Sequence, residues 1–298
     1  MNRANLSYLY AGIAVLFWST IPTIFKIGLG ELNVITFLSI ATFTSTTVLF
    51  LIILLQKKLY LLKKPSVNEL AASCLLGLIN PFIYYIILLK AYSLLPGQVA
   101  QPLNMIWPII LVFLSVPLLK HKIPAKSFFA LLISFTGVYI VSSEGHPFKP
   151  GSSNPLGVLL ATGSSFFWAL YFIFNVRDKR DEAVKLFTNF LFASIYLSVA
   201  MTVTGNWHSG LSLKGAGASV YAGLFEMGIT FLFWLKALSM AKTSDKISNL
   251  VYIAPFLSMI FLHFIVKEPV YYTTPLGLIF IISGIFVQNK KPAVAHKL

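Results

Sequence analysis

The sequence contains two similar apolar stretches, Gly77–Lys90 (GLINPFIYYIILLK) and Gly223–Lys236 (GLFEMGITFLFWLK), one in each half of the chain. Each is followed directly by the same Ala-x-Ser element. Both stretches lie in apolar runs that are long enough to cross a bilayer as a helix. They therefore predict an internal repeat in a membrane protein.

The composition excludes an ordinary soluble domain. The 298 residues are 57% hydrophobic and 11% charged, with a mean hydropathy of +0.81, whereas soluble domains average about 25% charged residues. Apolar runs of about 20 residues recur along the chain, and each predicts one membrane-spanning helix. We predict ten spans, at residues 8–27, 33–55, 70–89, 96–118, 127–143, 155–176, 186–204, 216–235, 246–266 and 271–288.

The net charge of +14 does not indicate a nucleic-acid-binding protein, because the basic residues are concentrated in alternate loops. Lys57 and Lys58, Arg177 and Arg180, and the C-terminal lysines would all lie on one side of the membrane. Such a bias is typical of cytoplasmic loops. It predicts a multi-pass protein of the cell membrane with both termini in the cytoplasm.

Further matches between the two halves follow in the same order. They are Phe17-Trp18-Ser19 with Phe167-Trp168-Ala169, Trp107-Pro108 with Ala254-Pro255, Lys122-Ile123-Pro124 with Lys267-Glu268-Pro269, and Thr136-Gly137-Val138 with Ser283-Gly284-Ile285. The Pro- and Gly-containing loop 144–154 separates the two halves of the chain. We therefore predict an all-α integral membrane protein with two five-helix repeats, residues 1–146 and 147–298. Because five is odd, the second repeat would be inverted relative to the first.

These motifs resemble the EamA-type members of the drug/metabolite transporter superfamily. The likeness rests on Phe17-Trp18 and Phe167-Trp168, on the Lys-Ala-x-Ser elements at Lys90 and Lys236, on Pro108 and Pro255, on Lys267-Glu268-Pro269, and on Gly277 with Ser283-Gly284. The resemblance implies ten helices in two inverted repeats, a central substrate pathway, export or exchange of small metabolites, and the bacterial inner membrane. The sequence departs from the family pattern at Ile123, where a Glu is expected.

Glu226 is the only acidic residue that we place well inside a predicted span. An ionised carboxylate is costly there, so it should face the bundle interior or a water-filled cavity. Proton coupling and a counter-charge for a substrate ammonium group are its candidate roles. The alternative is a neutral Glu226 that forms a structural hydrogen bond with a neighbouring helix.

Polar and aromatic side chains on several spans predict a central substrate pathway. Glu226, Thr230 and Trp234 have the spacing of one helix stripe. Asn80 and Tyr84 are the counterparts of Glu226 and Thr230 in the first half; hydrogen bonding between helices is the alternative for this pair. The predicted pathway residues are Trp18, Asn80, Tyr84, Gln101, Asn104, Trp107, Trp168, Tyr171, Asn175, Glu226, Thr230, Trp234, Asn249 and Tyr252.

Prolines within two predicted spans, Pro108 and Pro255, are candidate hinges, although static kinks are equally compatible with the sequence. Lys26, Lys90 and Lys236 lie near predicted span ends, where long basic side chains commonly extend to the membrane surface. We expect a structural role for His263.

The sequence favours a secondary transporter that exports or exchanges small organic metabolites, such as amino acids or amphipathic drugs, by alternating access. The alternatives are an uncoupled facilitator or importer, an integral-membrane transferase, and a non-transporting sensor. The sequence contains no P-loop and no metal-ligand spacing, and we expect no enzyme activity, cofactor or metal. The expected partners are a small-molecule substrate, the lipid bilayer and protons, but not nucleic acid. The protein would be a monomer or a homodimer.

Overall fold

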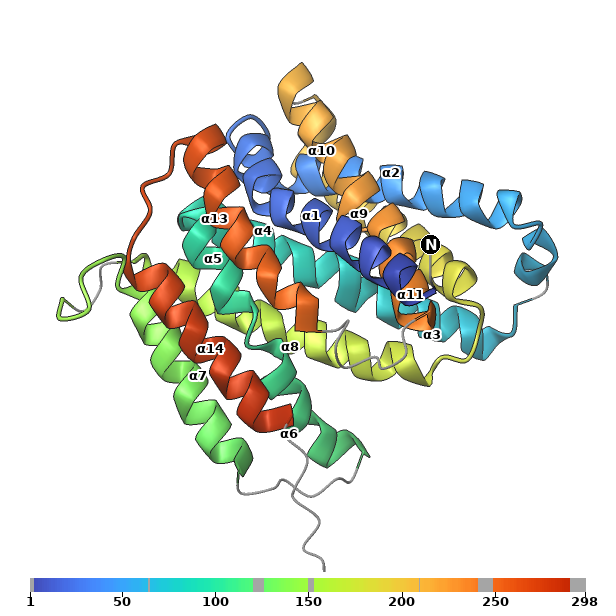
Figure 1. Cartoon of the computed structure of the whole chain (residues 1–298). Coiled ribbons are helices and arrows are strands. Elements are labelled where there is room, and N and C mark those ends of the chain that lie inside the picture. Colours follow the sequence, from blue (N-terminus) through green and yellow to red (C-terminus); the bar gives the residue numbers. More distant parts are fainter. Residues whose placement is uncertain are drawn as a thin grey trace, which may run out of the picture.

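The computed structural model describes residues 3–63, 65–119, 126–149, 153–208, 210–240 and 249–289 (Figure 1). The regular secondary structure in these residues is helical. The first half contains α1 (Arg3–Leu29), α2 (Val34–Leu55), η1 (Leu59–Leu62), α3 (Val67–Gly77), η2 (Leu78–Ile83), α4 (Tyr84–Leu94), α5 (Gly97–Asn104), α6 (Trp107–Leu119) and α7 (Lys126–Ser142). The second half contains α8 (Pro155–Arg177), α9 (Glu182–Thr204), η3 (Asn206–His208), α10 (Leu213–Phe225), α11 (Ile229–Met240), η4 (Asn249–Ile253), α13 (Ala254–Phe261), η5 (Leu262–Val266) and α14 (Thr273–Asn289).

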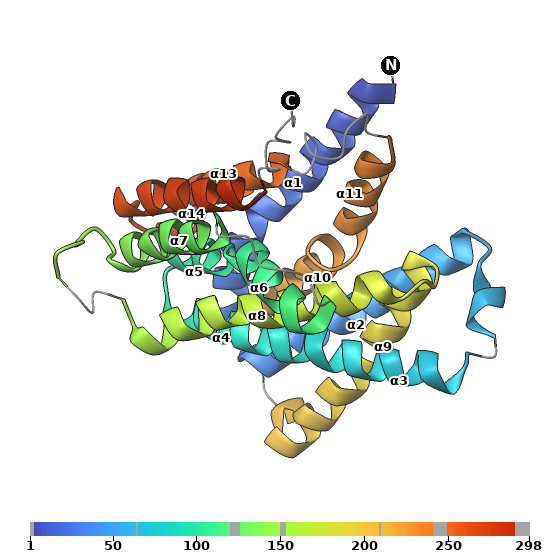
Figure 2. The same ribbon diagram turned by 90° about the horizontal axis from the view of Figure 1, so that it is seen from below.

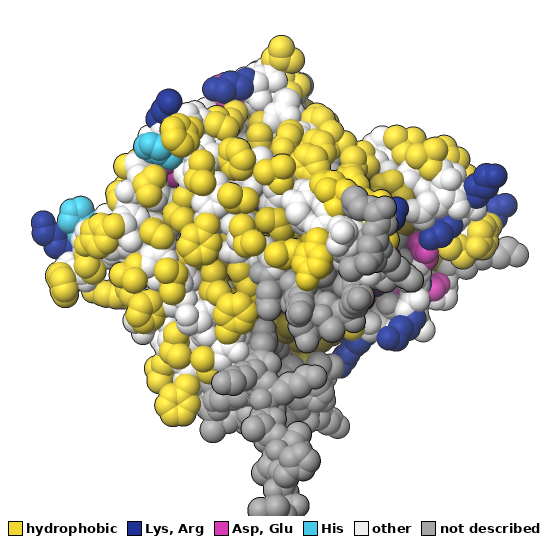
Figure 3. All heavy atoms as spheres, viewed as in Figure 1, with side chains coloured by type: hydrophobic (Ala, Val, Ile, Leu, Met, Phe, Trp, Pro, Cys, Tyr) yellow, Lys and Arg dark blue, Asp and Glu magenta, His cyan; other side chains and the backbone are white. Residues whose placement is uncertain are grey.

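Many of these helices have the length and composition needed to cross a membrane. Seven helical stretches within the described residues qualify: Asn5–Leu29, Val34–Leu55, Val67–Leu94, Gly97–Ser115, Pro155–Arg177, Glu182–Thr204 and Leu213–Trp234. Three shorter apolar helices accompany them, at Ser127–Ser142, Leu250–Val266 and Thr273–Gln288. Apolar side chains cover the face in Figure 3, with Lys and Arg side chains at its margins. This surface suits a lipid environment and not water.

Polar caps set the starts of several helices. Asn33 accepts a hydrogen bond from the Thr36 amide at the start of α2, and Asn154 caps α8 in the same way. Ser66 and Glu69 form a capping box at the start of α3. These side chains satisfy amide groups that have no partner within the helix. The loops between apolar runs therefore carry the information that fixes the helix boundaries.

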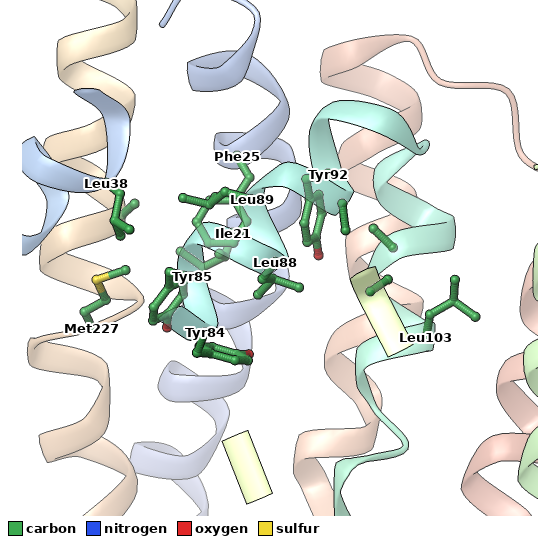
Figure 4. Close-up of a cluster of buried hydrophobic side chains, with 14 of the residues drawn as sticks. Ile21, Phe25, Leu38, Tyr84, Tyr85, Leu88, Leu89, Tyr92, Leu103 and Met227 are labelled. Carbon is green, nitrogen blue, oxygen red and sulfur yellow. The ribbon is translucent and has the colours of Figure 1, made fainter. Parts of the chain in front are cut away.

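The helices pack in a central bundle with one outlying pair. In the centre, α1 packs against α10, α11 and α13, while α8 packs against α4, α5 and α6. On the periphery, α2 packs against α9 and α10, and α3 packs against α9. The α7 and α14 helices lie side by side at one edge of the molecule in both ribbon views (Figures 1 and 2). The largest buried cluster lies where α1, α2, α4 and α5 meet the segment between α10 and α11 (Figure 4).

Glycines allow the closest helix contacts. A Cβ atom on Gly77 would collide with the carbonyl oxygen of Asn189 in α9, and one on Gly223 would collide with that of Ala41 in α2. At the crossing of α7 and α14, a Cβ on Gly137 would lie 2.5 Å from the carbonyl oxygen of Gly277. Small residues are common where membrane helices approach so closely. Both copies of the repeated stretch therefore begin with a glycine that permits contact with a neighbouring helix.

The predicted spans 70–89 and 216–235 largely coincide with the membrane-length helical stretches Val67–Leu94 and Leu213–Trp234. However, the helical geometry is interrupted inside both repeated stretches. In the first, α3 ends at Gly77, and Asn80 adopts an extended backbone with φ −147° and ψ 123°. Pro81 follows, and a proline disfavours helical geometry in the residue before it. In the second, α10 ends at Phe225 and α11 begins at Ile229. Gly228 lies in this interruption, and glycine weakens a helix.

Candidate functional site

Glu226 lies at the interruption between α10 and α11 and faces the first half of the chain. Its Oε1 atom accepts a hydrogen bond of 2.9 Å from the hydroxyl of Tyr85, near the start of α4. Tyr85 is fully buried, whereas Glu226 is half-buried and retains accessible surface. Tyr84 and Tyr85 lie side by side near Met227 (Figure 4). The carboxylate predicted from the sequence is therefore held in the bundle by a tyrosine that the sequence analysis did not select.

A short polar chain begins at the neighbouring tyrosine. The hydroxyl of Tyr84 donates to Asn104 Oδ1 over 3.2 Å, and Asn104 Nδ2 donates to Ser164 Oγ over 2.7 Å. The three residues belong to α4, α5 and α8. Asn104 is the last residue of α5, directly before the interruption that separates α5 from α6. Tyr84 and Asn104, which the sequence analysis selected on separate spans, are thus in direct contact, and Ser164 is an additional member of the chain.

Aromatic rings surround these polar groups. The Trp168 ring lies 5.1 Å from the ring of Tyr84, 6.4 Å from Trp107 and 6.5 Å from Phe231, measured between ring centroids. The Trp18 ring lies 5.8 Å from Phe231 and 5.3 Å from Trp234. These rings come from α1, α4, α6, α8 and α11. We call this group of rings, together with Glu226, Tyr85 and Asn104, the aromatic site.

The stripe predicted on a single helix is divided between two segments. Glu226 lies in the interruption, whereas Thr230 and Trp234 lie on α11. Thr230 is fully buried, and its Oγ1 has no hydrogen-bond partner. Trp234 contacts Trp18. Because the helix is broken at residues 226–228, the spacing of a continuous helix does not relate Glu226 to the other two side chains.

The other predicted pathway residues are placed as follows. Gln101 is half-buried on α5, and Tyr252 is half-buried on η4 and packs against Phe286 at 5.6 Å. The side chain of Asn249 lies outside the described residues. Pro108 and Pro255 are each the second residue of a helix, α6 and α13 respectively. Both also lie inside the longer apolar helical stretches Gly97–Ser115 and Leu250–Val266, as predicted. At the second residue of a helix the missing proline amide costs little, and the hinge role of the two prolines stays a prediction.

Asn80 and Tyr171 lie in a second polar cluster with Asn189, a residue that the sequence analysis did not select. Asn80, on η2, and Asn189, on α9, lie beside the hydroxyl of Tyr171 on α8. All three are buried. Asn175 follows Tyr171 by one turn of α8, and its Oδ1 is buried without a partner. The predicted grouping of Asn80 with Tyr84 is therefore replaced by two separate polar groups.

A third group joins the two halves where α1 ends. Lys26 Nζ donates to the carbonyl oxygens of Tyr92 and Leu95, both over 3.0 Å, and lies 3.9 Å from Glu268 Oε1. Glu268 is 8% exposed and accepts hydrogen bonds from the amides of Gly97 and Gln98. The expectation that Lys26 extends to the membrane surface is wrong, because buried carbonyls and a carboxylate hold its ammonium group. We call this group the Lys26–Glu268 network.

Gln98 extends this network. Its side-chain amide donates to the Pro269 carbonyl, and its Oε1 accepts a 3.1 Å hydrogen bond from the Tyr271 amide. His263 Nδ1 lies 3.0 Å from the Glu268 carbonyl oxygen, which is the structural role expected for it. By contrast, Lys90 is exposed, and the ammonium of Lys236 lies 4.8 Å from the centroid of the Tyr10 ring.

Sequence reasoning missed Tyr85, Ser164, Phe231, Asn189 and Glu268 as members of these groups. Tyr85 adjoins a selected tyrosine, but a continuous helix would direct adjacent side chains to different faces. Phe231 and Ser164 look like ordinary apolar or small helix residues in the sequence. Glu268 is visible only as part of the repeated Lys-x-Pro element, and its buried partners come from distant parts of the chain.

Comparisons with known proteins agree with a membrane transporter. The sequence model of the EamA-like transporter family matches residues 5–143 and 155–289. An uncharacterised transporter of Archaeoglobus fulgidus is 22% identical over 286 residues, covering 95% of this chain and 99% of the relative. An uncharacterised transporter of Bacillus subtilis is 21% identical over 72% of this chain and 70% of its own length.

Two further matches are a relative that is similar over part of the sequence and a solved structure that is similar over nearly the whole chain. An uncharacterised transporter of Clostridium kluyveri is 26% identical over 183 residues, and the match spans 58% of each protein. A crystal structure of a protein with 19% sequence identity superposes with a TM-score of 0.66, covering 96% of this chain and 97% of the other. This last similarity concerns the fold alone.

Proposed function

The chain belongs to the EamA-like transporter family of the drug/metabolite transporter superfamily and is a multi-pass membrane transporter, and we propose that it exports or exchanges a small organic metabolite across the cytoplasmic membrane. The convergence of Glu226, Tyr84 and the tryptophan rings between the two halves carries this proposal. Substrate sites of secondary transporters commonly lie at the interface between repeats, beside interrupted helices.

The chemistry of the aromatic site favours an amphipathic substrate with a positively charged amine. The faces of Trp18 and Trp168 offer stacking and cation–π contacts. Glu226 offers a counter-charge for an ammonium group, and Asn104 offers an amide. Amino acids with large neutral side chains and amphipathic drugs have this combination of groups. A phosphorylated substrate would instead require Arg or Lys side chains, and the interactions described in the aromatic site involve neither.

We further propose that Glu226 couples transport to protons. A carboxylate within a membrane bundle is costly in its ionised form, so its protonation can alternate with binding of a cationic substrate. Tyr85 would hold the carboxylate in position during this exchange. An uncoupled facilitator or importer that uses the same site is the second candidate, and it differs from the first in its response to a proton gradient.

The experiment that tests this proposal is transport by purified protein in liposomes, with amino acids screened in the presence and absence of an imposed proton gradient. Flux should respond to the gradient, and Glu226→Gln should abolish that response. Glu31→Gln is the matched control, because Glu31 is a more exposed carboxylate. It lies in the loop after α1 and pairs with Lys214 of α10. Gradient-independent flux that is the same in Glu226→Gln would exclude proton coupling through this residue and would favour the facilitator. Absence of flux for every amino acid tested would contradict the proposed substrate class.

The proposed architecture is ten membrane helices in two inverted repeats, residues 1–146 and 147–298, with cytoplasmic termini. Corresponding contacts in the two halves support it. The contact of α1 with α11 has its counterpart in that of α8 with α4, and the contact of α2 with α10 has its counterpart in that of α9 with α3. Gly77 against Asn189 likewise corresponds to Gly223 against Ala41. Such symmetry lets one chain adopt two opposite conformations around a central site.

Labelling of single cysteines would test the orientation. In a Cys74→Ser background, a membrane-impermeant maleimide added to intact cells should label Lys149→Cys, in a loop that we place outside. It should label Lys63→Cys, in a loop that we place in the cytoplasm, only after the membrane is permeabilised. The reverse pattern would show that the proposed orientation is incorrect.

With this orientation, the Lys26–Glu268 network lies at the outer end of the bundle. It joins residues of the first half to residues of the second. The network would break when the outer side opens and would re-form when it closes. It is therefore suited to act as the outer gate of an alternating-access cycle.

A further inference from the structure

Three elements bring unpaired oxygen atoms together beside the interruption between α3 and α4. Asn80, Tyr171 and Asn189 are 4%, 5% and 0% exposed. Asn80 Oδ1, Tyr171 Oη and both polar side-chain atoms of Asn189 lack a hydrogen-bond partner of normal geometry, although the two amide side chains lie beside the Tyr171 hydroxyl. Leu76 and Ile79 pack against Tyr171. Buried polar groups in apolar surroundings normally have partners. The oxygen atoms of this cluster are therefore suited to coordinate a bound ligand.

The backbone adds negative potential at the same place. The α3 helix ends at Gly77, three residues before the extended Asn80, and the C-terminal end of a helix carries a partial negative charge. Interrupted membrane helices use such ends and their freed carbonyl groups to coordinate Na⁺. The carbonyl of Asn189 approaches Gly77 closely. Asn189 therefore contributes to this region through both its side chain and the position of its backbone.

The charged groups beyond the cluster do not oppose a cation. Arg180 pairs with Asp178 at 2.5 Å, and Lys185 pairs with Glu182 at 2.8 Å. Both basic residues are thus neutralised by neighbouring carboxylates. The charged groups that act electrostatically on Tyr171 include the carboxylates of Glu182 and Asp178. The charges described near the cluster therefore balance in pairs.

We propose that Asn80, Tyr171 and Asn189 form a binding site for a dehydrated alkali-metal cation. Neutral amide, hydroxyl and carbonyl oxygens match the preference of such hard, singly charged ions for oxygen ligands. Divalent cations usually require carboxylates, and the described residues contain no cluster of three or more His, Cys, Asp or Glu side chains suited to a metal. Binding would tie α8 and α9 to the interruption that precedes Tyr84. The site is distinct from Glu226, and its existence does not depend on the proposed substrate or on proton coupling.

Thermal unfolding of the purified protein in detergent tests this site without any transport measurement. The midpoint temperature would be measured in NaCl, KCl and choline chloride at equal ionic strength. We expect a rise in NaCl or KCl over choline chloride that saturates with concentration, since a ligand that binds only the folded state stabilises it by mass action. Asn189→Leu, which keeps the side-chain size, should remove the rise. Tyr171→Phe, which removes one oxygen, should shift the saturation to higher salt.

Glu226→Gln provides the control, because it should retain the cation-dependent rise whatever its effect on transport. Equal midpoints of the unaltered protein in all three salts would overturn the proposal. So would a full cation-dependent rise in both Asn189→Leu and Tyr171→Phe. If Asn189→Leu fails to fold, Tyr171→Phe alone decides between a shifted and an unshifted saturation curve.

Discussion

Replacing Gly77 or Gly223 with alanine should destabilise the protein, although alanine is the better helix former. The added Cβ would enter the space of a backbone carbonyl oxygen, that of Asn189 for Gly77→Ala and that of Ala41 for Gly223→Ala. A backbone oxygen cannot rotate away, so the two helices must separate. Overpacking of this kind costs about 1–3 kcal/mol, which exceeds the gain of about 0.5–1 kcal/mol from replacing a helical glycine with alanine.

Matched controls exist in the same helix bundle. Apart from the local backbone of its own helix, an added Cβ on Gly12 in α1 or on Gly163 in α8 would have no atom within 4 Å. Gly12→Ala and Gly163→Ala should therefore leave the stability unchanged or raise it by about 0.5–1 kcal/mol. The difference between the two classes of variant isolates the close helix contact from the general effect of glycine on helix stability.

The assay is the fraction of protein that remains monodisperse in size-exclusion chromatography after heating in detergent, measured over a series of temperatures. Gly77→Ala and Gly223→Ala should lower the midpoint by similar amounts, because their contacts correspond. A midpoint for Gly77→Ala equal to that of Gly163→Ala would refute the close approach of α3 and α9. A large loss for only one of the pair would refute the correspondence between the two contacts.

Two other variants test the ends of the bundle. Glu268→Gln weakens the interactions with Lys26 and with the amide of Gly97, and charged hydrogen bonds of this kind contribute about 1.5–3 kcal/mol. The midpoint temperature in the same heating assay should therefore fall. An unchanged midpoint would argue against the Lys26–Glu268 network. Burial opposes ionisation of Asp178, but the hydrogen bonds and charge of Arg180 outweigh it and lower the pKa of that carboxyl. A lowered pKa in the folded state means that Asp178 stabilises the protein at neutral pH and loses this effect as the pH falls into the acidic range. Asp178→Asn should therefore lower stability at neutral pH and reduce its loss on acidification, and parallel pH profiles for both proteins would contradict this assignment.

The sequence predicts the helical class and the family because both depend on local, repeated patterns. Apolar runs indicate membrane helices wherever they occur, and the order of the paired motifs is visible without coordinates. The interruptions at Asn80 and Glu226 were not predicted, since hydropathy averages over a window and does not register a change of backbone direction. Pro81 and Gly228 were the available indications, and each is also compatible with a kinked continuous helix.

The sequence predicted several residues of the candidate site, but it did not predict most of the contacts between them. The cost of a buried carboxylate identifies Glu226, and tryptophans away from the membrane surface identify Trp18 and Trp168. Their partners depend on which helices meet, and helix spacing alone does not provide that information. Lys26 illustrates the difference: a position near the end of a span suggests a surface lysine, whereas a buried carboxylate from the other half of the chain determines its place.

The distribution of tryptophan has a practical consequence for spectroscopy. The chain contains five tryptophans, and Trp18, Trp107, Trp168 and Trp234 all belong to the aromatic site. Trp207, the remaining one, is 52% exposed on η3 and donates a hydrogen bond to Thr202. In a Trp207→Phe variant, the intrinsic fluorescence would come entirely from the rings of the aromatic site. A molecule that enters between these rings would change their emission directly, so occupancy could be followed in unlabelled protein.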